Sequence, residues 1–242
     1  MKALTPPQEL IDLVGGGDFV KVGNEFLNLY VEQGGLYPEA DVLDLGCGCG
    51  RMAVPLSGFL TSGSYRGFDA HAEAIAWCQE NISTQHSNFQ FEHVDAYSSR
   101  YNAGGTVRAE TYRFPYQGEQ FDFAFASSLF THLLSAETRN YLAETKRVLR
   151  AGGRALFTFF LLDPDALRLT SEGRTKLRFS TPAEGCYVAV ADDPARAVAY
   201  TPDAVESLFT AAGLTIRHIH PGRWPGRERG LTYQDLVVAQ PR

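Results

Sequence analysis

The segment from residue 42 to residue 51 carries side chains whose types and spacing fit the binding of a small cofactor. An apolar run, VLDL, leads into a turn with glycine at every second position and then into a segment that can form a helix. Glycines at such a turn let a ligand approach the backbone closely, because no Cβ stands in the way. The candidate binding residues of this segment are Asp44, Gly46, Cys47, Gly48, Gly50 and Arg51.

Two of these residues argue against a dinucleotide cofactor. The third glycine falls at Gly50, so Arg51 occupies a position that a dinucleotide-binding turn keeps small. The carboxylate of Asp44 would repel a pyrophosphate held at the following helix N-terminus. S-adenosylmethionine carries a sulfonium and an ammonium and no phosphate, so a carboxylate at this strand end complements it. The alternative is that Asp44 only caps a tight turn.

Two further acids follow the next two predicted strands. Asp69 ends the segment YRGFD, where a carboxylate can accept hydrogen bonds from both ribose hydroxyls of a nucleoside; its alternative role is to cap the next helix. Asp95 follows the third strand, where it can meet an adenine amino group or form a turn. We also expect the residues Ala70, Ala96 and Ser127, which follow strands two, three and four, to lie beside the cofactor.

The elements that would position these residues alternate along the chain as a mostly parallel sheet requires. Strands are predicted at 42–45, 65–68, 89–94, 121–126, 154–162, 214–220 and 231–239, and helices at 51–60, 72–82, 136–149 and 201–212. Residues 97–119 are a long loop without helical periodicity. We predict a single domain with an N-terminal helical cap (1–40), a cofactor-binding core (41–160), an insertion that shapes a substrate pocket (162–200) and a final helix and strand hairpin (201–242).

Composition narrows the class of protein. The chain has 242 residues, a formal charge of −6, four cysteines and no apolar run near the roughly 20 residues that span a bilayer. The charge disfavours nucleic acid as a partner, and the cysteines lack zinc-finger spacing, so we interpret them as reduced thiols and expect no metal site. We therefore expect a cytoplasmic enzyme that acts on a small molecule without binding membranes. Its oligomeric state is left open.

Together these residues resemble the class I S-adenosylmethionine-dependent methyltransferases. Asp44 with Gly46, Gly48 and Gly50 resembles the family's first motif, Asp69 its ribose-binding acid and Asp95 its adenine-side acid. FDFAFA at 121–126 and RVLRAGG at 147–153 resemble the fourth-strand motif and the turn before strand five. The resemblance implies an α/β, Rossmann-like, doubly wound sheet of seven strands, mostly parallel, with an antiparallel hairpin at one edge. A looser likeness, to bacterial small-molecule and sugar methyltransferases, includes residues 128–132 and 233–235.

His132 is the candidate catalytic base, because it follows strand four, where a side chain can face both cofactor and acceptor. A packed or capping histidine is the alternative. The predicted function is O-methylation of a small molecule such as a sugar or secondary metabolite. N-methylation of an amino sugar or other amine is a second interpretation, and a non-catalytic cofactor-binding module is a third.

Overall fold

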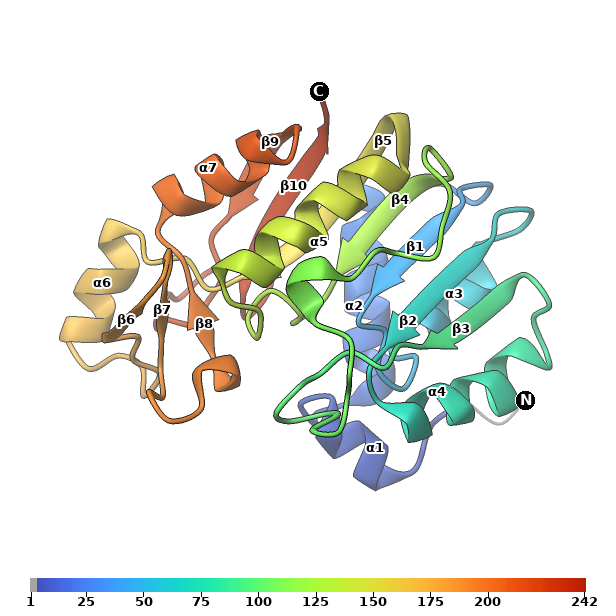
Figure 1. Ribbon diagram of the computed structural model, residues 1–242, viewed down its shortest axis with the longest axis horizontal. Coiled ribbons are helices and arrows are strands. Elements are labelled where there is room, and N and C mark those ends of the chain that lie inside the picture. The colour runs from blue at the N-terminus through green and yellow to red at the C-terminus, as the bar shows by residue number, and fades with distance from the viewer. Residues whose placement is uncertain (1–3) are drawn as a thin grey trace.

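A computed structural model describes residues 4–242, and its centre is a seven-stranded sheet (Figure 1). The strands lie in the order β3-β2-β1-β4-β5-β10-β9, and only β10 runs antiparallel to its neighbours. Their bounds are β1 (Val42–Leu45), β2 (Tyr65–Asp69), β3 (Phe89–His93), β4 (Phe121–Ala126), β5 (Leu149–Phe159), β9 (Leu214–His220) and β10 (Asp235–Pro241).

Helices cover both faces of this sheet, because β1 and β4 are apolar on both sides. The helices α5 (Ser135–Val148) and α7 (Pro202–Ala211) pack on the face that Leu43 and Ala124 present. The helices α2 (Phe19–Glu32), α3 (Ala53–Phe59) and α4 (Ala72–Cys78) pack on the opposite face, which Val42 and Phe125 present. A short helix, α1 (Gln8–Leu13), precedes them, and a π-helical turn, η1 (Gln79–Ser83), extends α4.

Between β5 and α7 the chain forms a separate small layer, seen beside the main sheet in Figure 1. It contains α6 (Pro164–Ser171), the strands β6 (Thr181–Ala183), β7 (Cys186–Val188) and β8 (Val198–Ala199), and a 3-10 turn, η3 (Pro194–Arg196). The strands form a three-stranded antiparallel sheet. The insertion thus returns to the core near Tyr200, whose backbone pairs with Leu161.

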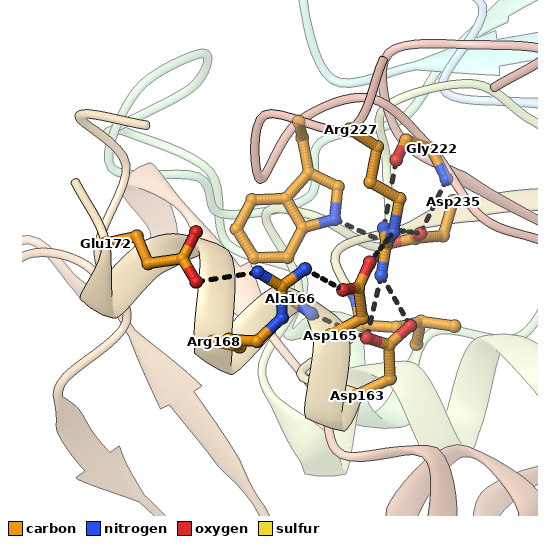
Figure 2. Close-up of polar contacts among 10 residues, drawn as sticks. Asp163, Asp165, Ala166, Arg168, Glu172, Gly222, Arg227 and Asp235 are labelled. Carbon is orange, nitrogen blue, oxygen red and sulfur yellow. Dashed lines mark hydrogen bonds and ion pairs between the residues drawn. The ribbon is translucent and has the colours of Figure 1, made fainter. Parts of the chain in front are cut away.

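A network of ion pairs joins this layer to the loop between β9 and β10 (Figure 2). Arg227 is only one tenth exposed and contacts Asp163 at 2.6 Å, Asp165 at 3.1 Å and the fully buried Asp235 at 3.4 Å. Asp235 also accepts hydrogen bonds from the backbone of Leu161, from Gly222 and from the indole of Trp224. The start of β10 is therefore fixed beside the end of β5.

The predicted sheet is confirmed, and so is the start of the last helix, where Thr201 accepts a hydrogen bond from the Ala204 amide. The predicted starts of two strands were wrong, and β5 ends at Phe159 rather than at residue 162. β5 begins at Leu149, five residues early, because Leu149 pairs with Phe121 of β4 and the pairing resumes at Arg154 after a register shift. β10 begins at Asp235, since the preceding residues form the loop that the Arg227 network holds. Within residues 4–242, no helix combines the length and apolar composition that crossing a bilayer requires.

Candidate cofactor and acceptor site

One cavity of about 700 Å³ opens at the carboxyl ends of the parallel strands. Its walls come from the glycine turn after β1, the segment after β2, the loop after β4, the insertion and the loop before β10. The carboxyl edge of a doubly wound sheet is where ligands bind in this architecture. The predicted site residues that line the cavity are Gly46, Gly48, Arg51, Asp69, Ala70, Ala96, Ser127 and His132.

The glycine turn is built tightly against its surroundings. Gly46 and Gly48 have φ angles of +74° and +52°, in the left-handed region that favours glycine. The amides of Gly46 and Cys47 both donate to the carbonyl oxygen of Phe68, which ties the turn to β2. A Cβ on Gly48 would lie 2.6 Å from a methyl carbon of Val14. The turn therefore has room for backbone and ligand but not for side chains.

Asp69 links this turn to the end of β2. Its two carboxylate oxygens accept hydrogen bonds from the backbone amides of Gly48 and His71, each at 2.8 Å. Burial raises the pKa of this carboxyl above its usual range, although these hydrogen bonds oppose the rise. The helix-capping alternative is wrong, because His71 caps α4 by accepting a hydrogen bond from the Ala74 amide. Asp69 is left with unused lone pairs at the cavity wall.

Three of the residues predicted in the segment 42–51 do not line the cavity, namely Asp44 of β1 and Cys47 and Gly50 of the turn. The carboxyl of Asp44 is 2% exposed and accepts a hydrogen bond of 2.6 Å from the hydroxyl of Tyr65. Burial raises its pKa to about 8, despite that hydrogen bond. A cation bound in the turn would favour the ionised form of this buried carboxyl. Asp44 lies below the cavity, so its charge would attract the cation from there.

Arg51 fastens the N-terminal segment over the turn. Its guanidinium donates to the carbonyl oxygen of Gly16 at 2.7 Å and lies 5.6 Å from the ring centroid of Phe19. The cavity is consequently lined by Leu13, Val14 and Gly15 on this side. Sequence reasoning placed Arg51 at the cofactor but missed this segment, because no motif marks it.

Asp95 is turned away from the cavity. Its carboxylate oxygens accept hydrogen bonds from the side chain of Asn102 and from both the amide and hydroxyl of Thr106. These contacts hold the pKa of this exposed carboxyl below its usual range. They fit the turn-forming interpretation, whereas the neighbouring Ala96 does line the cavity.

His132 lies in the loop after β4 and faces the cavity. Its Nδ1 is 2.9 Å from the carbonyl oxygen of Ala195, which can only accept, so this nitrogen carries the hydrogen. Burial lowers the pKa of the imidazole below its usual 6.5. The ring of Tyr101 lies edge-on to it, with 6.3 Å between centroids. In the same loop, Ser127 shares a hydrogen bond of 2.8 Å with the hydroxyl of Tyr30.

Several lining residues were not predicted, since they meet only in the fold. Ser128 has a φ angle of +63°, which is unusual for a residue with a side chain, and its hydroxyl donates to the amide oxygen of Gln234. Further unpredicted residues line the cavity as well, namely Tyr97, Tyr101, Glu137, Tyr141, Asp192, Asp193 and Tyr233. Of these residues, Ser128 and Tyr233 lie in segments that the looser likeness had included.

The residues present fit S-adenosylmethionine. Asp69 can accept from a ribose, and a positively charged ligand in the turn would favour the ionised form of the buried Asp44. Among residues 4–242, no group of three or more histidine, cysteine, aspartate or glutamate side chains could hold a metal ion. The four cysteines are free and buried.

Comparison with known proteins agrees with this geometry. The family model described as "Methyltransferase domain" matches residues 42–153. Residues 42–153 are thus similar to a methyltransferase domain. A crystal structure of a protein from Pyrococcus horikoshii OT3 has a TM-score of 0.64 at 18% identity, covering 95% of this chain and 93% of that one. An S-adenosylmethionine-dependent methyltransferase from Methanosarcina mazei has a TM-score of 0.60 at 19% identity, covering 87% and 96%.

Two further matches complete the comparison. Magnesium protoporphyrin IX methyltransferase from Synechocystis PCC 6803, solved with bound S-adenosylhomocysteine, has a TM-score of 0.58 at 14% identity, covering 94% of this chain and 90% of that one. Phthiotriol/phenolphthiotriol dimycocerosates methyltransferase 1 from Mycobacterium ulcerans is 31% identical over 120 residues. That match covers 48% of this chain and 36% of the relative, so the chain spans about a third of the relative's length. Together the solved structures show that the chain has the fold of these methyltransferases.

Proposed function

We propose that this chain transfers a methyl group from S-adenosylmethionine to an oxygen of a small polar acceptor. The observation that carries the proposal is the fixed tautomer of His132: the hydrogen on Nδ1 is held by Ala195, which leaves Nε2 of the neutral imidazole as an acceptor. Since burial lowers its pKa, the imidazole is neutral at physiological pH. It can therefore accept the proton of an acceptor hydroxyl.

The residues in the different walls of the cavity have different roles in this proposal. When bound, S-adenosylmethionine supplies an electrophilic methyl group on its sulfonium. Asp69 holds the ribose at the end of β2, and the glycine turn lets the amino-acid part approach the backbone. His132 orients the acceptor and takes its proton at Nε2, while the N-terminal segment and the loop after β3 restrict water.

The acceptor would enter between the insertion and the loop before β10. Tyr233 of the loop before β10 and Tyr97 of the loop after β3 both line the cavity, and each is 55% exposed, so their rings are accessible to a ligand. Gln234 and Ser128 add polar groups beside them. Neither the long loop after β3 nor the insertion fills the cavity, whose volume is within the usual range for small-molecule sites. This open space favours an enzyme over a non-catalytic cofactor-binding module.

One observation keeps an amine acceptor as the second candidate. Asp192 and Asp193 of the insertion line the cavity, and their carboxylates would attract a protonated amine. His132 could remove that proton as well. The name of the mycobacterial relative gives phthiotriol and phenolphthiotriol dimycocerosates as its substrates, and the acceptor of this chain need not be related to them. The formal charge of −6 supports a small molecule over nucleic acid. Cytoplasmic location stays a prediction.

A turnover screen tests the proposal. The chain is incubated with S-adenosylmethionine and panels of sugars, phenols and amines, and the release of S-adenosylhomocysteine is measured beside His132→Ala. We expect turnover with at least one hydroxyl compound and little with amines. Turnover with amines alone would establish N-methylation instead. Binding of the cofactor without turnover on any panel would favour the non-catalytic module.

A further inference from the structure

The cavity continues past Asp69 into a slot with apolar walls. Phe68 of β2, Val94 and Ala96 after β3, and Tyr141 of α5 line it and belong to one buried cluster. The rings of Phe68 and Tyr141 pack against each other, with 6.3 Å between their centroids, so together they form one of these apolar walls. A slot of this kind, next to the acid that would hold a ribose, suits a flat heteroaromatic ring.

Glu137 stands at the wall of this slot, one helical turn before Tyr141 on the same face of α5. Its Oε2 accepts a hydrogen bond of 2.7 Å from the amide of Leu134, and no other donor from residues 4–242 reaches this carboxylate. Burial raises the pKa of Glu137, and the nearby Glu110 adds to the rise. The cavity thus contains a half-buried acid whose second oxygen has no protein donor.

Asp95, the acid that the sequence predicts beside the adenine, already accepts hydrogen bonds from its own loop. Both oxygens of Asp95 are used within the loop after β3, by Asn102 and Thr106, and Asp95 does not line the cavity. That loop returns to the core at Ala109, in the 3-10 turn η2 (Ala109–Thr111), which packs against α5. The adenine slot is therefore bounded by α5 rather than by Asp95.

From this geometry we infer that Glu137, and not Asp95, accepts the hydrogen bond from the 6-amino group of the cofactor's adenine. The inference rests on the proposed function, because it takes Asp69 as the ribose acid. A site built to pair with an amino group rejects an analogue that lacks it, since its buried acceptor is then left unpaired. In S-inosylhomocysteine a carbonyl oxygen replaces the amino group and would face the carboxylate.

Calorimetry with both ligands tests the inference. We expect the wild-type chain to bind S-adenosylhomocysteine at least about tenfold more tightly than S-inosylhomocysteine. Glu137→Gln should reduce this ratio to within about threefold, because an amide can donate to the carbonyl of the inosine analogue. Asp95→Asn should keep the wild-type ratio. Glu206→Gln, on the exposed side of α7, is the matched control and should also keep it.

The ratio of affinities separates recognition from folding, because a partly unfolded variant loses affinity for both ligands equally. The side-chain amide introduced by Glu137→Gln retains an oxygen for the Leu134 amide, which protects the start of α5. A ratio lost in Asp95→Asn and kept in Glu137→Gln would overturn the inference, as would equal affinities in the wild type. Absence of S-adenosylhomocysteine binding to a folded wild-type chain would contradict the proposed function itself.

Discussion

The amide of Gly48 donates a hydrogen bond of 2.8 Å to Oδ2 of Asp69, and this contact joins the glycine turn after β1 to the end of β2. One carboxylate thereby shapes the turn and faces the cavity. Because the second strand pairs directly with the first, the two parts of the sequence motif meet through a single side chain.

Replacement of Asp69 by alanine should weaken S-adenosylhomocysteine binding far more than it weakens folding. Hydrogen bonds to a charged acceptor contribute about 1.5 to 3 kcal/mol each, so the affinity should fall roughly tenfold or more. Calorimetry and thermal unfolding measure the two effects. Asp203→Ala, in the first turn of α7, is a control that should leave affinity unchanged. An Asp69→Ala variant with a lower melting temperature and full affinity would assign Asp69 to structure alone.

Asp44 should make the chain less stable as the pH rises. Its pKa is about 8 in the folded chain against 3.8 for an ordinary aspartate, so the folded state holds a proton that the unfolded state releases. The stabilising contribution is complete below pH 4 and is lost as the pH rises from about 4 through about 8, by up to about 5 kcal/mol. Asp44→Asn, whose amide oxygen can still accept from Tyr65, should become relatively more stable over that range.

Chemical denaturation of both proteins from pH 4 to pH 9 measures this difference. Subtracting the variant's curve from that of the wild type removes the contributions of other acids. A difference that does not change with pH would show that Asp44 is ionised in the folded chain.

Replacement of His132 by alanine should lower turnover by roughly a hundred- to ten-thousand-fold and leave cofactor affinity nearly intact. The rate should show an acidic limb with its midpoint below pH 6.5, because burial lowers the pKa of this imidazole and protonation removes the base. The limb should be absent in the variant. His218→Ala, on the exposed edge strand β9, is the matched control. If the variant keeps both the wild-type rate and the acidic limb of the pH profile, His132 is not the base.

Arg227 and Arg168 offer a matched pair of arginines that both contact Asp165 (Figure 2). Arg227→Ala should lower the free energy of unfolding by about 3 kcal/mol or more, because it leaves the buried Asp235 without its cation. Arg168→Ala should have a much smaller effect, since that pair is exposed to solvent. Urea denaturation compares them. Equal losses of unfolding free energy in the two variants would show that burial does not determine the strength of these ion pairs.

The sheet could be predicted because its strands are short apolar runs separated by strong turn signals, and the glycine turn with Asp69 follows from residue spacing. What the sequence could not show is the direction of individual side chains. Asp44 lies in the first strand and Asp95 follows the third, as expected, yet Asp44 lies below the turn and Asp95 faces its own loop. Glu137 joins the cavity wall only because α5 packs across the loop after β3, a contact between segments far apart in sequence.

Calorimetric titration of the chain with S-adenosylmethionine, S-adenosylhomocysteine and NAD tests the central claim most directly. Arg51 occupies the position after the third glycine that a dinucleotide-binding turn keeps small, whereas the turn and Asp69 suit a nucleoside without a pyrophosphate. We expect binding of both adenosyl compounds and no measurable binding of NAD. Tight binding of NAD without binding of S-adenosylmethionine would contradict the account.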